Sequence, residues 1–121
     1  MAFCLIVDDD PMSCKIAADI AGSLGMDVKS ETNSMRALAF CDTKMPDLLI
    51  LDILMPRFDG IAFIKQLHKM IGGRHPYIIA CTAKNDAETV STLKQEGIND
   101  FILKPFDRET LVKKIKKSTL A

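Results

Sequence analysis

A doubly wound α/β fold, built on a five-stranded parallel sheet, is the architecture that this sequence of 121 residues predicts. Three observations support the prediction. Short apolar runs alternate with segments of helical periodicity, and the pattern occurs five times along the chain. The strongest of these runs do not alternate with polar residues, which is typical of parallel strands buried on both faces. Hydrophobic residues make up 48% of the chain and charged residues 26%, so we expect one globular domain with one core.

Five segments are expected to form the strands of this sheet. Residues 3–7, 48–51 and 77–81 are the strong candidates, because they are almost entirely apolar. Residues 27–30 are a weak candidate, and residues 100–103 complete the set. Because consecutive parallel strands are joined by right-handed crossovers, the intervening helices should cover both faces of the sheet.

Helical spacing of apolar residues predicts a helix after each strand. Glycines support two of the ends, since Gly25 follows the first expected helix and Gly97 the fourth. The third helix is expected to stop at Gly72. The expected helices cover residues 12–24, 34–42, 61–71, 86–96 and 107–118. The residues taken to mark their apolar faces are Ile16, Ile20, Leu24; Met35, Leu38, Ala39; Ile61, Ile64, Leu67, Ile71; Ala87, Val90, Leu93; and Leu111, Val112, Ile115.

The charges of the chain cancel overall but are unevenly distributed. Residues 1–60 carry 5 basic and 10 acidic residues, and residues 61–121 carry 11 and 6. Zero net charge argues against a nucleic-acid-binding domain. The lysine run at 113, 114, 116 and 117 is interpreted as a solvated helix face, with direct nucleic-acid binding as the alternative. The excess of acids in the first half indicates that they gather at one place.

Several other features favour a cytoplasmic, soluble protein. No apolar run approaches the roughly 20 residues that span a bilayer, and the N-terminus lacks the basic region of a signal peptide. The four cysteines are not spaced as CxxC pairs or as zinc ligands with the histidines. We therefore expect them to be reduced and structural.

Polar residues follow four of the predicted strands directly. In an open parallel sheet, ligands bind beyond the carboxyl ends of the strands. Asp8 and Asp9 follow the first strand, and Asp52 follows residues 48–51. Thr82 and Lys104 follow the fourth and fifth strands. These side chains should therefore meet at one edge of the sheet.

The charges at this edge predict a divalent metal ion. Asp8, Asp9 and Asp52 with Lys104 sum to −2, and like charges a few ångströms apart cost about 4 kcal/mol per pair at an effective dielectric near 20. Ligands that are all oxygen favour Mg²⁺ or Mn²⁺ over Zn²⁺. Asp52 ends an apolar strand, where an unpaired carboxylate is costly. Other acids that precede helices are expected to be ordinary N-caps, namely Asp10, Asp59 and Asp107.

A carboxylate beside a metal, an ammonium group and a hydroxyl is suited to phosphoryl transfer. Asp52 can act as the nucleophile and form an aspartyl phosphate. The metal and Lys104 can neutralise charge on the phosphoryl oxygens, and Thr82 can donate a hydrogen bond to the bound group.

The chain resembles the receiver domains of bacterial two-component response regulators, of the chemotaxis-regulator type. The matching segments are LIVDDD ending at Asp10, LLILDILMPRFDG around Asp52, residues 81–83 and FILKPF at 101–106. The intervals are 44 residues from Asp8 to Asp52, 30 from Asp52 to Thr82 and 22 from Thr82 to Lys104. The resemblance covers essentially the whole chain and implies a flavodoxin-like (βα)5 fold.

The resemblance implies roles for single residues. Asp52 matches the phosphoryl acceptor, and Asp9 matches the direct metal ligand, assisted by Asp8 partly through water. The backbone carbonyl of Leu54 matches the third protein ligand of Mg²⁺. Thr82 and Lys104 match the residues that coordinate the phosphoryl group.

Further positions are implied in switching and in phosphoryl lifetime. Phe101 matches an aromatic switch residue that moves inward when Thr82 engages the phosphate. Leu54 and Lys84 stand where the attacking water passes, and an apolar Leu54 should make the phosphoryl group long-lived. The Lys104–Pro105 peptide bond matches one that is often cis.

The implied partners are proteins. A histidine kinase or a histidine phosphotransfer protein would donate the phosphoryl group, and a downstream effector would bind the face of the fourth helix, last strand and last helix. A monomer or a phosphorylation-linked dimer is expected, without membrane or direct nucleic-acid binding. Residues 1–121 are expected to be a receiver domain with no output domain, which catalyses only its own phosphorylation and dephosphorylation.

Three alternatives to a phosphorylated receiver domain stay open on the sequence alone. A degenerate receiver could act as a phosphate-independent interaction module. A Mg²⁺-dependent phosphatase would normally carry a second aspartate two residues after Asp52, where Leu54 stands. A flavin-binding module would need a Ser/Thr/Gly-rich loop after the first strand, where residues 8–11 read DDDP.

Overall fold

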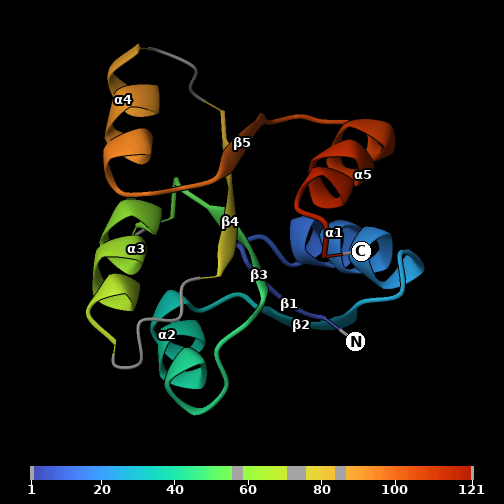
Figure 1. The fold of residues 1–121 in the computed structure, drawn as a ribbon, viewed down its shortest axis with the longest axis horizontal. Coiled ribbons are helices and arrows are strands. Elements are labelled where there is room, and N and C mark those ends of the chain that lie inside the picture. Colours follow the sequence, from blue (N-terminus) through green and yellow to red (C-terminus); the bar gives the residue numbers. More distant parts are fainter. Residues whose placement is uncertain (1, 56–58, 71–75, 84–86, 121) are drawn as a thin grey trace.

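The computed structural model describes residues 2–55, 59–70, 76–83 and 87–120 (Figure 1). These residues form one five-stranded parallel sheet in the order β2-β1-β3-β4-β5, which confirms the predicted fold class. The strands are β1 (Phe3–Val7), β2 (Asp27–Glu31), β3 (Leu48–Asp52), β4 (Tyr77–Thr82) and β5 (Asp100–Leu103). The helices are α1 (Pro11–Ser23), α2 (Ser34–Thr43), α3 (Gly60–His68), α4 (Ala87–Gln95) and α5 (Arg108–Lys117).

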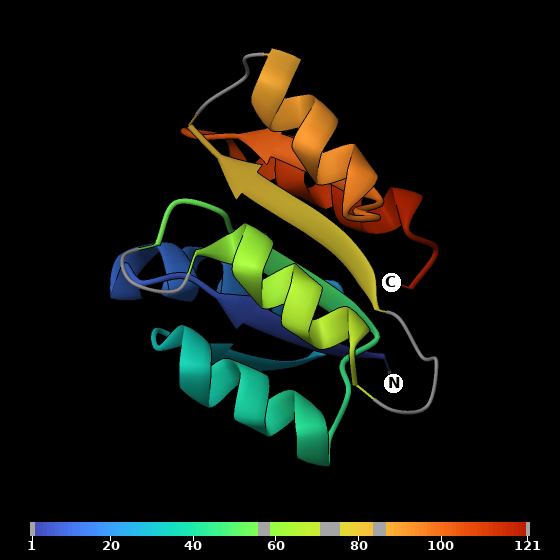
Figure 2. The same ribbon diagram turned by 90° about the vertical axis from the view of Figure 1, so that its left-hand side faces the viewer.

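Helices cover both faces of the sheet. Figure 2 shows α2, α3 and α4 side by side across one face, and Figure 1 shows α1 and α5 together on the other. Each face buries its own apolar cluster against the strands. Phe63 of α3 and Leu93 of α4 belong to the first cluster, and Ile20 of α1 and Leu111 of α5 belong to the second. Burial of both strand faces explains why β1 and β3 are buried along their whole length.

The strands that matter most for function are longer than the sequence predicts. Asp52 is the last residue of β3 and lies opposite Cys81 in β4. Thr82 is the last residue of β4 and lies opposite Leu103 in β5. Sheet hydrogen bonding therefore fixes the backbone of both residues, although neither is apolar. The expected end of the third helix at Ile71 and Gly72 lies outside the described residues.

Three helix faces differ from the prediction. Ile16 of α1 is 50% exposed and Met35 of α2 is 58% exposed, so neither packs into the core. Ala39 of α2 and Ala87 of α4 lie outside the buried core as well. The buried face of α1 is instead formed by Cys14, Ala17, Ile20 and Ala21, and that of α2 by Ala37 and Cys41. Small side chains at these positions let the helices pack closely against the sheet, whereas the prediction followed the larger apolar residues.

Local features support the helix boundaries. Asp10, Asp59 and Asp107 are N-caps, each accepting a backbone N–H with its carboxylate. Gly25 and Gly97 have φ angles of 87° and 85°, a region that favours glycine just after a helix. The Lys104–Pro105 bond is cis, as the resemblance implied. None of the described helices combines the length and apolar character that a membrane crossing requires.

The four cysteines are unpaired and buried, as the sequence predicts. Cys41 lies in the cluster beneath α2, α3 and α4, while Cys4, Cys14 and Cys81 lie in the cluster beneath α1 and α5. Burial raises the pKa of all four thiols well above the usual value. The thiols are therefore not ionised at neutral pH, and they pack within the two cores.

Candidate functional site

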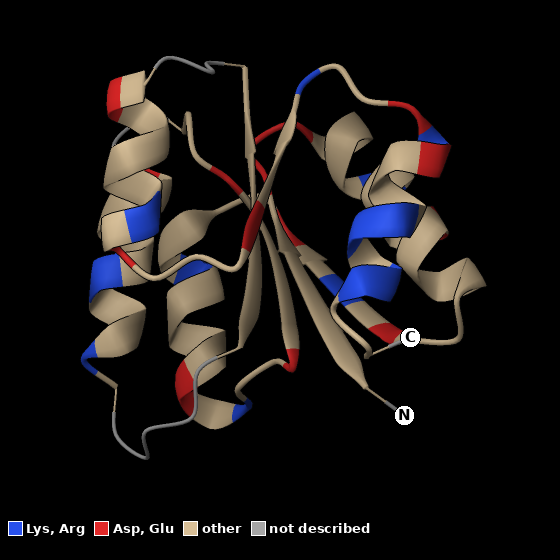
Figure 3. Cartoon of the chain, turned by 45° about the horizontal axis from the view of Figure 1, so that its top comes forward, with Lys and Arg blue, Asp and Glu red and all other residues tan. Residues whose placement is uncertain are grey.

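The carboxyl ends of four adjacent strands bring the predicted site residues together. Asp8 and Asp9 follow β1, Asp52 ends β3, Thr82 ends β4 and Lys104 follows β5. Since β1, β3, β4 and β5 are neighbours in the sheet and parallel, these ends lie at one edge. Acidic segments from separate parts of the chain meet there in Figure 3. The excess of acids in the first half of the sequence is partly explained by this arrangement.

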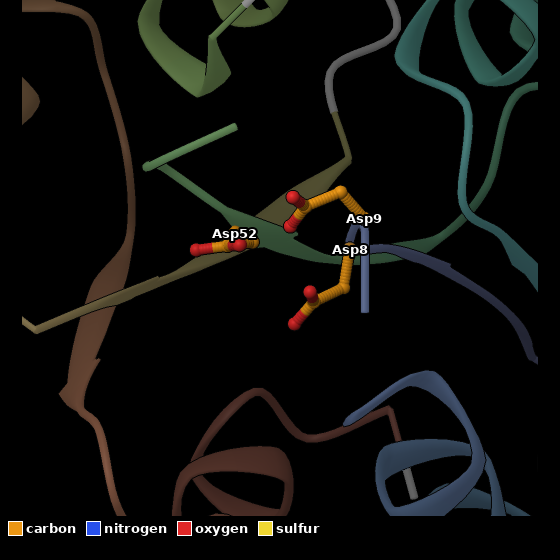
Figure 4. A group of neighbouring side chains, drawn as sticks. All are labelled: Asp8, Asp9 and Asp52. Carbon is orange, nitrogen blue, oxygen red and sulfur yellow. The ribbon is translucent and has the colours of Figure 1, made fainter. Parts of the chain in front are cut away.

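Three carboxylates form a compact oxygen cluster at this edge (Figure 4). Asp8, Asp9 and Asp52 each offer an oxygen that lies within 4.8 Å of the others. Asp8 and Asp52 are each only 6% exposed, whereas Asp9 is exposed. A donor set made only of carboxylate oxygens fits a hard divalent cation such as Mg²⁺ or Mn²⁺.

Lys104 provides a positive charge beside the two buried carboxylates. Its Nζ lies 2.6 Å from Oδ2 of Asp8 and 3.7 Å from Oδ2 of Asp52. Burial lowers the pKa of Lys104, but the hydrogen bond with Asp8 and the charges of both aspartates outweigh it, so the pKa is raised overall. Lys104 therefore stays cationic and offsets one of the negative charges.

The carboxyl group of Asp52 has a raised pKa. Burial, with the nearby charge of Asp8, raises the pKa of Asp52 to about 6. Lys104 and the backbone N–H of Leu54, which donates to Oδ1 at 3.3 Å, act in the opposite direction. At neutral pH the group is mostly ionised and incompletely compensated, as a nucleophile or metal ligand requires.

The remaining predicted residues surround this centre. Thr82 is fully buried, and its carbonyl accepts the backbone N–H of Lys104 at 2.8 Å, which joins the ends of β4 and β5. Leu54 lies two residues beyond Asp52 with 49% of its surface exposed. Phe101 is half-buried in β5, where it lies opposite Ala80 of β4 and two residues before the end of β5. Lys84 lies outside the described residues.

Cys14 contributes to the site in a way that the sequence does not predict. Its thiol donates to the backbone carbonyl of Asp8 at 3.2 Å and so fixes α1 against the loop that carries Asp8 and Asp9. The Asp8 carboxylate in turn accepts the backbone N–H of Asp10 at 3.0 Å. Nothing in the sequence indicates this role, because a cysteine on a helix is usually an apolar core residue.

Gly60 fits tightly against the backbone that follows Asp52. A Cβ atom at this position would lie 2.7 Å from the carbonyl oxygen of Asp52 and 2.7 Å from Cα of Ile53. The Gly60 N–H also donates to the Ile53 carbonyl at 3.0 Å. The start of α3 is therefore pressed against the end of β3, and only glycine fits without a backbone shift.

Gly60→Ala is expected to destabilise the protein by about 2 kcal/mol, because backbone atoms must move to accept the methyl group. The shift of Asp52 should also weaken Mg²⁺ binding. Urea unfolding and calorimetric titration with Mg²⁺ measure the two effects. Gly22→Ala in α1 is the matched control: a Cβ atom there would have no neighbour within 4 Å, so it should stabilise by up to about 1 kcal/mol. Equal stability of the two variants would contradict the close approach.

Comparison with known proteins assigns the chain to a family. Residues 4–116 match the sequence pattern of the response regulator receiver domain. The chain belongs to the response regulator receiver domain family. The receiver domain is 36% identical over 113 residues to the probable C4-dicarboxylate response regulator DctR of Halalkalibacterium halodurans, covering 88% of this chain and 46% of that protein. It is 31% identical over 115 residues to the DNA-binding transcriptional regulator NtrC of Salmonella typhimurium, covering 93% of this chain and 24% of that protein.

Solved structures agree with this assignment. The chemotaxis protein CheY4 of Vibrio cholerae superposes on the receiver domain with a TM-score of 0.91, at 26% identity and with 98% of each chain covered. The receiver domain spans about half or less of the length of DctR and NtrC. The family, the fold and a role in two-component signal transduction are therefore confirmed.

Proposed function

We propose that this receiver domain accepts a phosphoryl group on Asp52, in a Mg²⁺-dependent reaction, from a histidine kinase or a histidine phosphotransfer protein. The observation that carries the proposal is the buried Asp52 carboxylate, which lies within reach of Lys104 and in one oxygen cluster with Asp8 and Asp9. The proposal treats residues 1–121 as one receiver domain that acts in the cytoplasm.

Each residue of the site has a role in this reaction. An oxygen of Asp52 attacks the phosphorus atom while the bond from phosphorus to the donor nitrogen breaks, which leaves an acyl phosphate on the protein. The ammonium group of Lys104 neutralises charge on the phosphoryl oxygens, and the hydroxyl of Thr82 donates to one of them. Asp8, Asp9, Asp52 and the Leu54 carbonyl would hold the metal. When bound, Mg²⁺ or Mn²⁺ supplies positive charge to the carboxylates and the phosphoryl group.

The output of the reaction is a change in a protein-binding face formed by α4, β5 and α5. Phe101 is half-buried in this face and is the proposed switch residue. Lys114 of α5 lies 2.9 Å from Oδ1 of Asp100 and 6.0 Å from the centroid of the Phe101 ring. These contacts connect α5 to β5, so inward movement of Phe101 would alter the packing of the face. A downstream effector would read that change, with the domain acting as a monomer or a phosphorylation-linked dimer.

Intact-protein mass spectrometry after incubation with acetyl phosphate tests the proposal. We expect one phosphoryl group to be added in the presence of Mg²⁺, to be released by hydroxylamine, and to be missing in Asp52→Asn. No addition in wild-type protein that binds Mg²⁺, either with acetyl phosphate or with a phosphorylated phosphotransfer domain, would contradict it. The domain would then be a phosphate-independent interaction module.

Leu54→Asn is expected to shorten the lifetime of the phosphoryl group about tenfold, because an amide can orient the attacking water whereas leucine cannot. The position is open to water, since Leu54 is 49% exposed. Loss of the phosphoryl adduct is followed by mass spectrometry after removal of acetyl phosphate. Met35→Asn, at a 58% exposed apolar position in α2, is the control and should leave the lifetime unchanged. An unchanged lifetime in Leu54→Asn would count against this role.

A further inference from the structure

An apolar cleft adjoins the carboxylate cluster on the face of the sheet covered by α1 and α5. Its volume is 390 Å³, within the range of about 300–1,000 Å³ that is usual for small-molecule sites. Ile16 and Ala17 of α1 line one side, and Phe106, in the loop before α5, lines another. Ile16, which the sequence predicted in the core and which is half exposed, therefore forms part of the wall of this cleft.

One end of the cleft is charged. Asp8, Asp52 and Lys104 line it there, while most of the other lining residues are apolar. In Figure 4 the Asp8 side chain extends toward the side on which α1 and α5 lie. Lys104 pairs with Asp8 at 2.6 Å and lies 3.7 Å from Asp52, so these three groups together carry a net charge of −1. An apolar space that ends at a group of charges with a net value of −1 is complementary to an amphipathic cation.

We propose that the cleft binds a small amphipathic amine, with its ammonium group against Asp52 and its apolar body between Ile16 and Phe106. An anionic ligand fits the metal-free cleft less well, because the three charged groups that line it carry a net charge of −1. A neutral ligand would leave this net negative charge in a partly dehydrated site. The amine would provide a second input to the receiver domain, independent of a kinase.

Binding of the amine and of a metal should be antagonistic. Both place positive charge at Asp52, which belongs to the oxygen cluster with Asp8 and Asp9. By linkage, Mg²⁺ must weaken amine binding by the same factor by which the amine weakens Mg²⁺ binding. This competition rests on the proposed metal site, whereas amine binding to the metal-free protein does not.

Titration of ¹⁵N-labelled metal-free protein at pH 8 with 2-phenylethylammonium tests the proposal. We expect a dissociation constant roughly in the millimolar range, as is usual for a ligand of this size, and amide shifts at Ile16, Ala17 and Phe106. The neutral 2-phenylethanol and the anionic 3-phenylpropionate are matched probes. Each should bind at least about tenfold more weakly than the amine. Equal binding of the three probes, shifts confined to other surfaces, or no binding at tens of millimolar would overturn the proposal.

Variants place the ligand within the cleft. Ile16→Ser removes an apolar wall that is half exposed, so amine binding should weaken about fivefold while Mg²⁺ affinity is unchanged. Met35→Ser, at a similarly exposed apolar position on α2, should change neither amine binding nor Mg²⁺ affinity. Unaltered amine binding in Ile16→Ser would contradict the assignment. If the phosphoryl-acceptor function fails its own test, amine binding to the metal-free protein is still expected.

Discussion

Asp52→Asn is expected to raise the free energy of unfolding of the metal-free receiver domain by about 2 kcal/mol at pH 7.5. Burial and the charge of Asp8 raise the pKa of this carboxyl from 3.8 to about 6. Ionising it therefore costs the folded state more than the unfolded chain. Asparagine is uncharged and can still accept the Leu54 N–H that Asp52 accepts at 3.3 Å. The substitution removes the cost and keeps the hydrogen bond.

The pH dependence of this gain has a definite sign. A carboxyl with a raised folded-state pKa favours the folded state below the unfolded pKa, and this contribution is lost as pH rises to about 6. The gain from Asp52→Asn should therefore be largest above pH 6 and disappear below pH 4. Saturating Mg²⁺ should reduce it, because the metal compensates the charge of wild-type Asp52.

Urea unfolding in EDTA at pH 4, 6 and 7.5 measures the effect. Asp19→Asn, at a position of α1 outside the buried core, is the control and should change stability by less than about 0.5 kcal/mol at each pH. Equal stability of Asp52→Asn and wild type at pH 7.5 would show that the buried charge is fully compensated by Lys104.

Lys104→Met is expected to tighten Mg²⁺ binding about tenfold and to slow phosphorylation by acetyl phosphate about a hundredfold or more. The two effects have opposite signs because the ammonium group repels a metal but stabilises the transferring phosphoryl group. Its Nζ lies 2.6 Å from Asp8 and 3.7 Å from Asp52, so methionine removes a full charge from the centre of the site.

The same substitution should destabilise the metal-free protein by about 3 kcal/mol, since two buried carboxylates lose their shared partner. Calorimetric titration with Mg²⁺ and the rate of adduct formation by mass spectrometry give the two main readouts. Lys114→Met is the control, because its ammonium group pairs with Asp100 instead, at 2.9 Å. Weaker Mg²⁺ binding in Lys104→Met would show that the lysine orders the carboxylates more than it repels the metal.

Much of the site could be predicted from the sequence because it depends on topology. A polar residue directly after an apolar run, such as Asp52 or Thr82, must lie at the carboxyl edge of a parallel sheet, whatever the details of packing. The family resemblance then added expected roles to positions that were already notable. The hydrogen bond between Lys104 and Asp8, 96 positions apart in the chain, follows from the same logic.

Features that depend on close packing could not be predicted in this way. Helical spacing placed Ile16 and Met35 in the core, but Ala17 and Ala37 are buried in their place. Hydrophobicity does not show whether a helix lies near enough to the sheet to need a small residue. The cleft beside Asp52 was missed for a related reason, because its walls come from α1 and from the loop around Phe106, whose spacing only the folded chain defines.

The buried cysteines allow local opening of the unmodified protein to be measured. A thiol reacts with an alkylating reagent only when it is exposed and ionised, and both conditions are suppressed at all four positions. Cys41 belongs to one face of the sheet, and Cys4, Cys14 and Cys81 belong to the other. Mass-resolved alkylation therefore measures how often each helical layer separates from the sheet. If Cys41 reacted faster than the other three, the α2–α3–α4 layer would be opening without global unfolding.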